Sequence, residues 1–136
     1  MNGDTHLNID LDKLLSFHNK YNSLATIVVT YATNPKEQEL VIVENNDIKE
    51  FYKREDPKHF FYLEKNPHPL MNAGVYVLNK EILKRIPANA NISLEKEIFS
   101  DIKREIKVFF YGGYIRDIGD LDSLKEFNKD VLEGRI

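Results

Sequence analysis

The chain opens with Asn-Gly-Asp-Thr-His at residues 2–6, and this stretch leads straight into a predicted amphipathic helix over residues 11–21. An Asp beside a Gly, just before a helix, is typical of the carboxyl end of a core strand in an α/β sheet, where ligands bind. No strand precedes residue 2 in this sequence. Asp4 is therefore either an ordinary turn residue or a site residue in the second half of a larger domain, and we favour the second interpretation.

The composition is that of an ordinary globular domain. The chain has 136 residues, of which 42% are apolar and 30% are charged, and this length is enough for one domain with its own core. The net charge of −3 argues against a nucleic-acid-binding surface. The absence of cysteine excludes disulfides, thiolate metal sites and cysteine nucleophiles. Because the sequence has no apolar run of membrane-spanning length and no signal-peptide pattern, we expect a cytoplasmic protein without a membrane partner.

The hydrophobic pattern alternates between strand-like and helix-like segments. Residues 25–31 form a β-branched, nearly continuous apolar run, which predicts a strand buried on both faces. The polar residues 45–47 between two short apolar runs predict a hairpin. Residues 53–58 are predicted to be a charged loop. Strands are predicted at 25–31, 40–44, 48–52, 72–78 and 108–111, and helices at 11–21, at 80–85, from Ser93 onward and after residue 120. This order predicts an α/β layer structure with a mixed sheet, about half of a doubly wound domain.

Two aspartates are the best candidates for chemistry. Asp4 directly follows Gly3, Asp117 lies two residues before Gly119, and each glycine allows a tight backbone turn; Asp117 also follows a predicted extended segment. Mg²⁺ is commonly held by one or two carboxylates, while waters and substrate phosphates fill the remaining positions. Two aspartates at one sheet edge would meet that requirement, although each taken singly also fits a helix cap or a turn.

Other combinations of residues give weaker signals. Lys53, Arg54 and Lys58 fit either a phosphate site or a solvated loop. The four histidines lack metal-ligand spacing, and the six glycines are scattered rather than grouped in a phosphate-binding loop.

Several short motifs occur together in a characteristic order. They are Asn-Gly-Asp at 2–4, Ile-Asp-Leu at 9–11, Phe-His at 17–18, Ala-Thr-Ile at 25–27, Asn-Ala-Gly-Val-Tyr-Val-Leu at 72–78, Ser-Leu-Glu-Lys-Glu-Ile-Phe at 93–99 and Tyr-Ile-Arg-Asp-Ile-Gly at 114–119. In this order and spacing the chain resembles the sugar-1-phosphate nucleotidyltransferases, or nucleoside-diphosphate-sugar pyrophosphorylases. Within that family it looks most similar to the bacterial heptose or mannose 1-phosphate guanylyltransferase branch.

The resemblance implies a fold and an activity. The fold would be a three-layer α/β/α Rossmann-like nucleotidyltransferase fold with a mixed sheet and without its N-terminal half. Residues 1–136 would be the C-terminal, metal- and sugar-binding part of that domain. The family joins a sugar 1-phosphate to a nucleoside triphosphate and releases pyrophosphate. For this branch the implied role is nucleotide-sugar biosynthesis for lipopolysaccharide or capsule.

The resemblance also implies residue roles. Asp4 and Asp117 would act as the catalytic metal ligands for Mg²⁺. Asn72 and Gly74 would line the sugar pocket, and Glu95 would accept hydrogen bonds from sugar hydroxyls. The family's phosphate-binding lysine would fall at Lys53 or Arg54, with the pair at 64–65 as a rival placement.

The family's N-terminal half carries the glycine-rich loop and the base pocket, and no such loop occurs in this sequence. We therefore expect the isolated chain to be inactive. An alternative is a non-catalytic sugar-phosphate-binding or assembly module derived from the same fold, and a chance match of an unrelated α/β domain is a third. Guanine is the expected base, with adenine and cytosine open, and the sugar is open between heptose and hexose. Half a sheet would also expose an edge strand through which copies of the chain could form a homo-oligomer.

Overall fold

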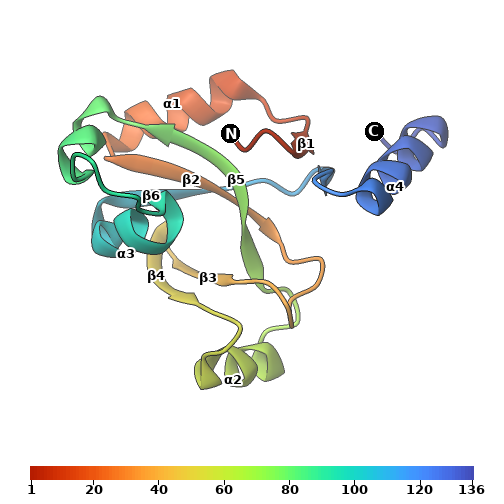
Figure 1. Ribbon diagram of the computed structural model, residues 1–136, viewed down its shortest axis with the longest axis horizontal. Coiled ribbons are helices and arrows are strands. Elements are labelled where there is room, and N and C mark those ends of the chain that lie inside the picture. The colour runs from red at the N-terminus through yellow and green to blue at the C-terminus, as the bar shows by residue number, and fades with distance from the viewer.

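The computed structural model describes residues 1–136 and is built around strand β2 (Ala25–Tyr31). β2 pairs in parallel with β6 (Ile106–Phe110) and antiparallel with β5 (Leu70–Leu78). The five strands lie in the order β3-β4-β6-β2-β5 (Figure 1). The predicted mixed sheet is confirmed, and β2 is buried along almost its whole length.

The hairpin of β3 (Leu40–Glu44) and β4 (Asp47–Tyr52) is also confirmed. Its turn residues Asn45 and Asn46 have φ values of 52° and 67°, the left-handed pair that a two-residue hairpin turn needs and that Asn tolerates. β4 joins the sheet through the Asp47–Lys107 pairing with β6.

Helix α2 (Pro57–Lys65) replaces the end of the predicted charged loop. Pro57 occupies the first turn, where its missing N–H costs nothing, and the Asp56 side chain accepts a hydrogen bond from the Lys58 backbone N–H at 2.8 Å. The proline that marked a break in the sequence therefore starts a helix. α2 lies below the hairpin in Figure 1.

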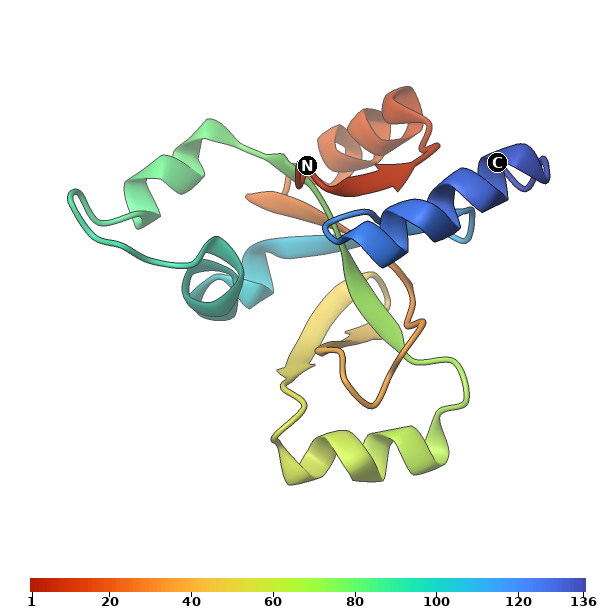
Figure 2. The ribbon, with the colours of Figure 1, turned by 45° about the vertical axis from the view of Figure 1, so that its right-hand side comes forward.

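The sheet is covered on both faces, which gives the three layers (Figure 2). Helix α1 (Leu11–Tyr21) begins after Asp10, whose side chain caps the Lys13 N–H, and it packs Leu14 against Val28 of β2. On the other face Ile27 and Val29 pack against a helical segment that continues into α3 (Phe99–Asp101). The alternation of β2 side chains between the two clusters follows from the period of two in a strand.

The helical segment before α3 and the connection after β5 are less regular than predicted. Ser93 caps a single π-helical turn at Leu94–Ile98, and the helix predicted at 80–85 is a 3₁₀ segment at Lys80–Arg85. A short 3₁₀ turn at Lys103–Glu105 leads into β6.

A separate two-stranded ribbon stands beside the main sheet. It consists of β1 (Thr5–Leu7) and β7 (Ile115–Asp117), so a strand separates Asp4 from helix α1. Helix α4 (Leu121–Leu132) follows and projects from the body beside the C-terminus (Figure 1).

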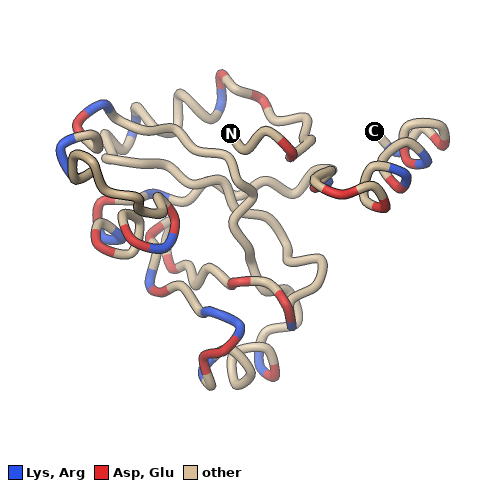
Figure 3. Tube along the Cα trace, viewed as in Figure 1, with Lys and Arg blue, Asp and Glu red and all other residues tan.

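Charged side chains of both signs are interspersed over the helices and turns in Figure 3. None of the helices combines the length and the hydropathy that crossing a bilayer requires.

Candidate active site

A cavity of about 510 Å³ opens where the ribbon, β5 and the loop after β2 meet. Three of the residues that line it, Asn72, Glu95 and Asp117, were selected from the sequence as site residues, and Gly74 is a fourth. Lys53, Arg54 and Asp4 are not among the lining residues. Sequence positions that are far apart thus meet at one opening.

Asp4 and Asp117 are brought together by the register of the ribbon. Thr5 of β1 pairs with Asp117 of β7, and the Ile118 N–H donates to the Asp4 carbonyl oxygen at 2.7 Å. The two carboxylates approach each other over Gly119. A Cβ placed on Gly119 would lie 3.1 Å from Asp117 Oδ1 and 3.2 Å from Asp4 Oδ2. The aspartates therefore converge beside a small ribbon rather than at the edge of the main sheet.

The donor set at this point fits a hard divalent cation. Both carboxylates are exposed, and both border the space that the missing Gly119 side chain leaves free. Asp117 Oδ1 also accepts a hydrogen bond from the Gly119 N–H at 2.8 Å, which fixes its orientation. Nowhere in the chain do three or more His, Asp or Glu side chains group as metal ligands. Two carboxylates suit Mg²⁺, which usually retains several waters and phosphate oxygens.

Asn72 and Glu95 are linked by a third residue that the sequence analysis missed. Asn72 Nδ2 donates to the Tyr76 hydroxyl at 2.9 Å, and that hydroxyl in turn donates to Glu95 Oε1. Asn72 Oδ1 accepts from the Gly74 N–H at 2.9 Å. Burial, and then the hydrogen bond to Glu95, raise the pKa of Tyr76 well above its usual range, so the hydroxyl remains a donor. Glu95 is thus oriented through one oxygen, and the second oxygen forms no hydrogen bond within the protein.

Gly74 is required by the backbone of the site. Its φ is +70°, and a Cβ there would lie 2.7 Å from the Asn2 side-chain nitrogen. The Asn2 N–H donates to the Gly74 carbonyl oxygen at 2.9 Å. The N-terminal segment therefore lies directly against Gly74, and a side chain at position 74 would displace it.

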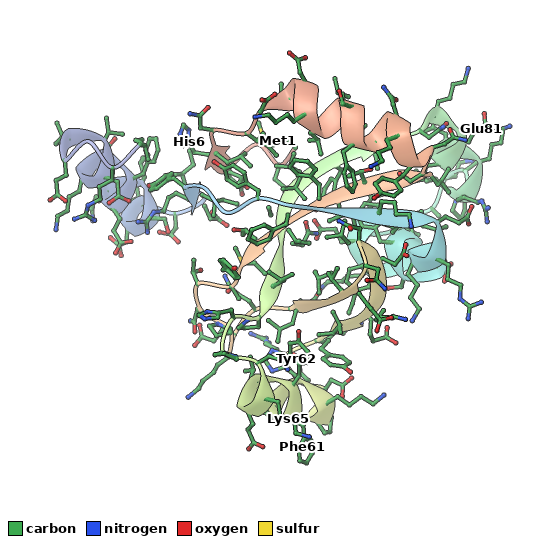
Figure 4. The ribbon with its side chains drawn as sticks, turned by 180° about the vertical axis from the view of Figure 1, so that it is seen from behind. Met1, His6, Phe61, Tyr62, Lys65 and Glu81 are labelled. Carbon is green, nitrogen blue, oxygen red and sulfur yellow. The ribbon has the colours of Figure 1, made fainter.

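The two candidate phosphate-binding cations lie elsewhere. Lys53 and Arg54 occupy the exposed turn between β4 and α2, where Arg54 pairs with Glu55 at 2.6 Å. Lys65, from the rival placement, is on α2, at the opposite end of the molecule from Met1 and His6 (Figure 4). The structure does not bring these cations to the cavity, and their assignment to the sugar phosphate remains a prediction.

Arg116 is the one cationic side chain that lines the cavity, and it is already paired. Its guanidinium donates to Glu126 and to Asp130, each at 2.6 Å. The hydrogen bond with Tyr114 and the pair with Asp130 hold the pKa of Arg116 above its ordinary value. Three carboxylates, Glu39, Glu95 and Asp117, also line the cavity. The cavity therefore has no unpaired positive charge.

Strand alternation could have identified Tyr76, since residues 72 and 76 of one strand share a face. Arg116 directly precedes Asp117 in the sequence, but no sequence pattern indicates that carboxylates of α4 neutralise the Arg116 guanidinium. Thr33, Gln38 and Glu39 also line the cavity, and no motif marks these residues.

The chain matches known proteins over nearly its whole length. The family model described as "Nucleotidyl transferase" matches residues 1–134. A mannose-1-phosphate guanylyltransferase of Mycobacterium tuberculosis is 27% identical, over 98% of this chain and 36% of its own. The catalytic subunit beta of a mannose-1-phosphate guanylyltransferase of Drosophila melanogaster is 31% identical, over 98% of this chain and 33% of its own.

Solved structures agree on the fold. HddC from Yersinia pseudotuberculosis superposes with a TM-score of 0.74 at 17% identity, covering 96% of this chain and 53% of that protein. A putative glucose-1-phosphate thymidylyltransferase from Bacillus anthracis superposes with a TM-score of 0.68 at 16% identity, covering 93% and 51%. The chain therefore spans about half the length of these structures and about a third of the length of the sequence relatives. The resemblance seen in the sequence is confirmed, and the chain belongs to the nucleotidyl transferase family.

Proposed function

We propose that this chain is the metal- and sugar-binding part of a sugar-1-phosphate nucleotidyltransferase, with residues 1–136 forming the C-terminal part of the catalytic domain. The observation that carries the proposal is that Asn72, Gly74, Glu95 and Asp117 line a single cavity, with Asp4 beside Asp117. The names of the sequence relatives support the same reaction class.

In the proposed reaction, a phosphate oxygen of the sugar 1-phosphate attacks the α-phosphorus of a nucleoside triphosphate. A new phosphorus–oxygen bond forms, and the bond from the α-phosphorus to the bridging oxygen breaks, so that pyrophosphate leaves with the electron pair. Such a reaction depends mainly on positioning and on neutralising charge. The product would be a nucleoside-diphosphate sugar.

Asp4 and Asp117 would hold Mg²⁺, which when bound supplies the positive charge that phosphate oxygens need. The Gly119 N–H keeps Asp117 Oδ1 oriented, and the backbone contact between Ile118 and Asp4 keeps the second aspartate beside it. These contacts hold the Asp117 carboxylate and the Asp4 backbone in place before any ligand binds.

Glu95 would recognise the sugar. Tyr76 holds one of its oxygens, and the other is available to accept a hydrogen bond from a sugar hydroxyl. Asn72 positions the Tyr76 hydroxyl and is itself held by the Gly74 N–H. Glu95 reaches the cavity from the π-helical turn, so its orientation depends on this chain of hydrogen bonds across to β5.

The charge of the cavity predicts metal-dependent binding. Because Arg116 is paired with α4, a sugar phosphate dianion would meet three carboxylates without a free cation. We therefore expect sugar 1-phosphate to bind only when a divalent cation occupies Asp4 and Asp117.

The finer assignments belong to the same proposal. Guanine is the expected base, and heptose or mannose the expected sugar, in nucleotide-sugar biosynthesis for lipopolysaccharide or capsule in the cytoplasm.

β5 ends the five-stranded sheet, and its Gly74 carbonyl oxygen accepts a hydrogen bond from the Asn2 N–H. A homo-oligomer formed along this edge is part of the proposal.

The test is a calorimetric titration of the chain with mannose 1-phosphate, with and without Mg²⁺. We expect binding only in the presence of Mg²⁺, and its loss in Asp117→Asn and Glu95→Gln. Glu81→Gln, at an exposed carboxylate that does not line the cavity, is the matched control and should bind normally. Absence of binding under all conditions, in a folded chain, would contradict the proposal.

A second titration tests whether this chain catalyses the reaction by itself. Adding GTP to the mannose 1-phosphate complex should release no pyrophosphate from this chain alone, because the chain has no glycine-rich loop. The gene sequence upstream of the Met1 codon then distinguishes the enzyme from the non-catalytic binding module. A glycine-rich loop after a strand, in frame, supports the enzyme, whereas translation starting at Met1 supports the binding module.

A further inference from the structure

One wall of the cavity is a loop that is folded by its own hydrogen bonds. We call residues 33–39 the cavity wall, because Thr33, Gln38 and Glu39 line the cavity from this side. The Gln38 side chain accepts from the Asn34 N–H at 2.9 Å and donates to the Thr33 hydroxyl at 3.1 Å. These bonds shape the cavity wall but do not fix it against the sheet.

A single hydrogen bond joins the cavity wall to the rest of the molecule. His59 Nε2 of helix α2 donates to the Gln38 carbonyl oxygen at 3.0 Å. Because a carbonyl oxygen only accepts, Nε2 must carry the proton. Just before the wall, the Ala32 N–H is bound to the Pro69 carbonyl oxygen at 2.9 Å, and just after it Leu40 begins strand β3 and pairs with Tyr52. Between these two held ends, the His59 bond is the one hydrogen bond that ties the wall itself to the rest of the molecule.

The imidazole of His59 is costly at this position. The residue is fully buried, with 0% of its surface exposed, and Nδ1 has no hydrogen-bond partner in the protein. Leucine would fill much of the same volume without an unpaired polar atom. What the imidazole adds is therefore the bond from Nε2 to Gln38.

Helix α2 provides a firm support for this bond. Its N-terminus is capped by Asp56, and the Tyr62 ring packs edge-on against Tyr52 of the hairpin at 5.8 Å. In Figure 4, Tyr62 lies on the side of α2 that faces the hairpin, whereas Phe61 points away. A displacement of α2 would pass through His59 to the cavity wall.

We propose that His59 is a positioning residue for the sugar-phosphate cavity: its Nε2 bond to Gln38 holds the cavity wall at the distance from Asn72 and Glu95 at which a sugar ring is bound. The proposal rests on the proposed function for its ligand, but the anchoring of the wall can be measured without any ligand.

The experiment compares three variants of the full chain. His59→Leu removes the bond. His59→Gln restores it, because the glutamine amide nitrogen lies the same number of bonds from Cβ as Nε2. His68→Leu makes the same change at an exposed histidine outside α2 and is the control. Amide hydrogen exchange of residues 34–38 reports the wall, and calorimetry reports the affinities for mannose 1-phosphate and for Mg²⁺.

In His59→Leu we expect exchange at Glu37 and Gln38 to become about five- to tenfold faster, as the loss of one net hydrogen bond implies. The affinity for mannose 1-phosphate should fall by a similar factor, whereas the affinity for Mg²⁺ should not change. His59→Gln should restore both readouts, and His68→Leu should match the unmodified chain. Should His59→Leu fail to fold, His59→Asn replaces it, because its shorter amide does not reach Gln38.

Two outcomes would overturn the proposal: wild-type exchange and affinity in folded His59→Leu, or a defect in His59→Gln equal to that of His59→Leu. If the chain binds no mannose 1-phosphate but exchange becomes faster in His59→Leu, the proposed ligand is wrong and the anchoring of the wall by His59 still stands. If the chain binds mannose 1-phosphate but exchange is unchanged in His59→Leu, only the proposed role of His59 is wrong, and the proposed function still stands.

Discussion

Gly119 shows how one missing side chain shapes the site. Its hydrogen atom leaves open the space between Asp4 and Asp117, and a methyl group would lie 3.1 Å and 3.2 Å from their oxygens. We predict that Gly119→Ala pushes the carboxylates apart and weakens Mg²⁺ binding by about tenfold or more, since Mg²⁺ tolerates little distortion of its octahedral geometry. Isothermal titration with Mg²⁺ measures this.

Gly3→Ala is the matched control for Gly119→Ala, because no atom lies within 4 Å of the added Cβ. It should bind Mg²⁺ as the unmodified chain does. Equal affinities in Gly119→Ala and Gly3→Ala would show that the two aspartates do not share one ion.

His18 gives a prediction for the pH dependence of stability. Its Nδ1 lies 2.8 Å from the Thr26 hydroxyl beneath α1, and burial lowers its pKa below the ordinary value of 6.5. The unfolded chain therefore binds a proton at a higher pH than the folded chain does. The free energy of unfolding should fall as the pH drops below about 6.5, by no more than about 1.4 kcal/mol per pH unit for one proton.

Urea unfolding between about pH 7 and pH 5.5 measures this slope. His18→Gln keeps a hydrogen-bonding side chain but does not titrate, so its stability should depend less on pH. His68→Gln, at an exposed position, should retain the full dependence. The same slope in all three proteins would exclude His18 as the titrating group.

At the scale of elements, a buried carboxylate joins α4 to the ribbon, together with the Arg116–Glu126 pair and the ring contact between His6 and Phe127. The Asp130 side chain is only 4% exposed and accepts hydrogen bonds from Tyr114, Arg116 and Arg135 at 2.6–2.9 Å. The Tyr114 hydroxyl, followed by Arg116, holds the pKa of Asp130 below its usual range. Leu121 and Leu132 are mostly exposed, so apolar packing at these ends of α4 contributes little.

We predict that Asp130→Asn loosens α4 without unfolding the sheet. Removing the charge leaves two guanidinium groups poorly neutralised, and breaking a buried pair on one side is strongly destabilising. Amide exchange within residues 121–132 should become faster by a factor on the order of ten, while exchange in α1 stays the same. Asp122→Asn breaks an exposed pair with Lys125 and should change neither. Uniformly faster exchange in both helices would instead mean global destabilisation.

At the scale of the whole molecule, stability depends on two packed faces of one sheet. Leu14 is 1% exposed and packs against Val28, Ala73 and Val75, so it joins α1 to β2 and β5. Leu14→Ala should lower the free energy of unfolding by about 2–5 kcal/mol, through lost burial and a residual cavity. Leu15→Ala, one residue along and 47% exposed, should cost far less. Equal losses in urea denaturation would show that α1 is not packed through Leu14.

Much of the fold could be predicted because its signals are local. The apolar run of β2 and the asparagine turn between β3 and β4 are each decided within a few residues. Helix α2 was missed because Pro57 and its charged neighbours suggest a break, whereas a proline at the first helical position is favourable. Lys53 and Arg54 were selected by position in a motif, which cannot tell which way a turn faces.

The sequence by itself determined the family, the mixed α/β layers and the residue types of the candidate site, because hydrophobic period, turn chemistry and motif order are properties of neighbouring residues. The tertiary structure alone decided that Thr5 pairs with Asp117, that α4 neutralises Arg116 and that His59 reaches Gln38. Each of these contacts joins residues that are separated along the chain, and a shift of one residue in strand register would remove the first of them. Long-range register and packing therefore brought the candidate residues Asn72, Glu95 and Asp117 to one cavity, which local patterns could only suggest.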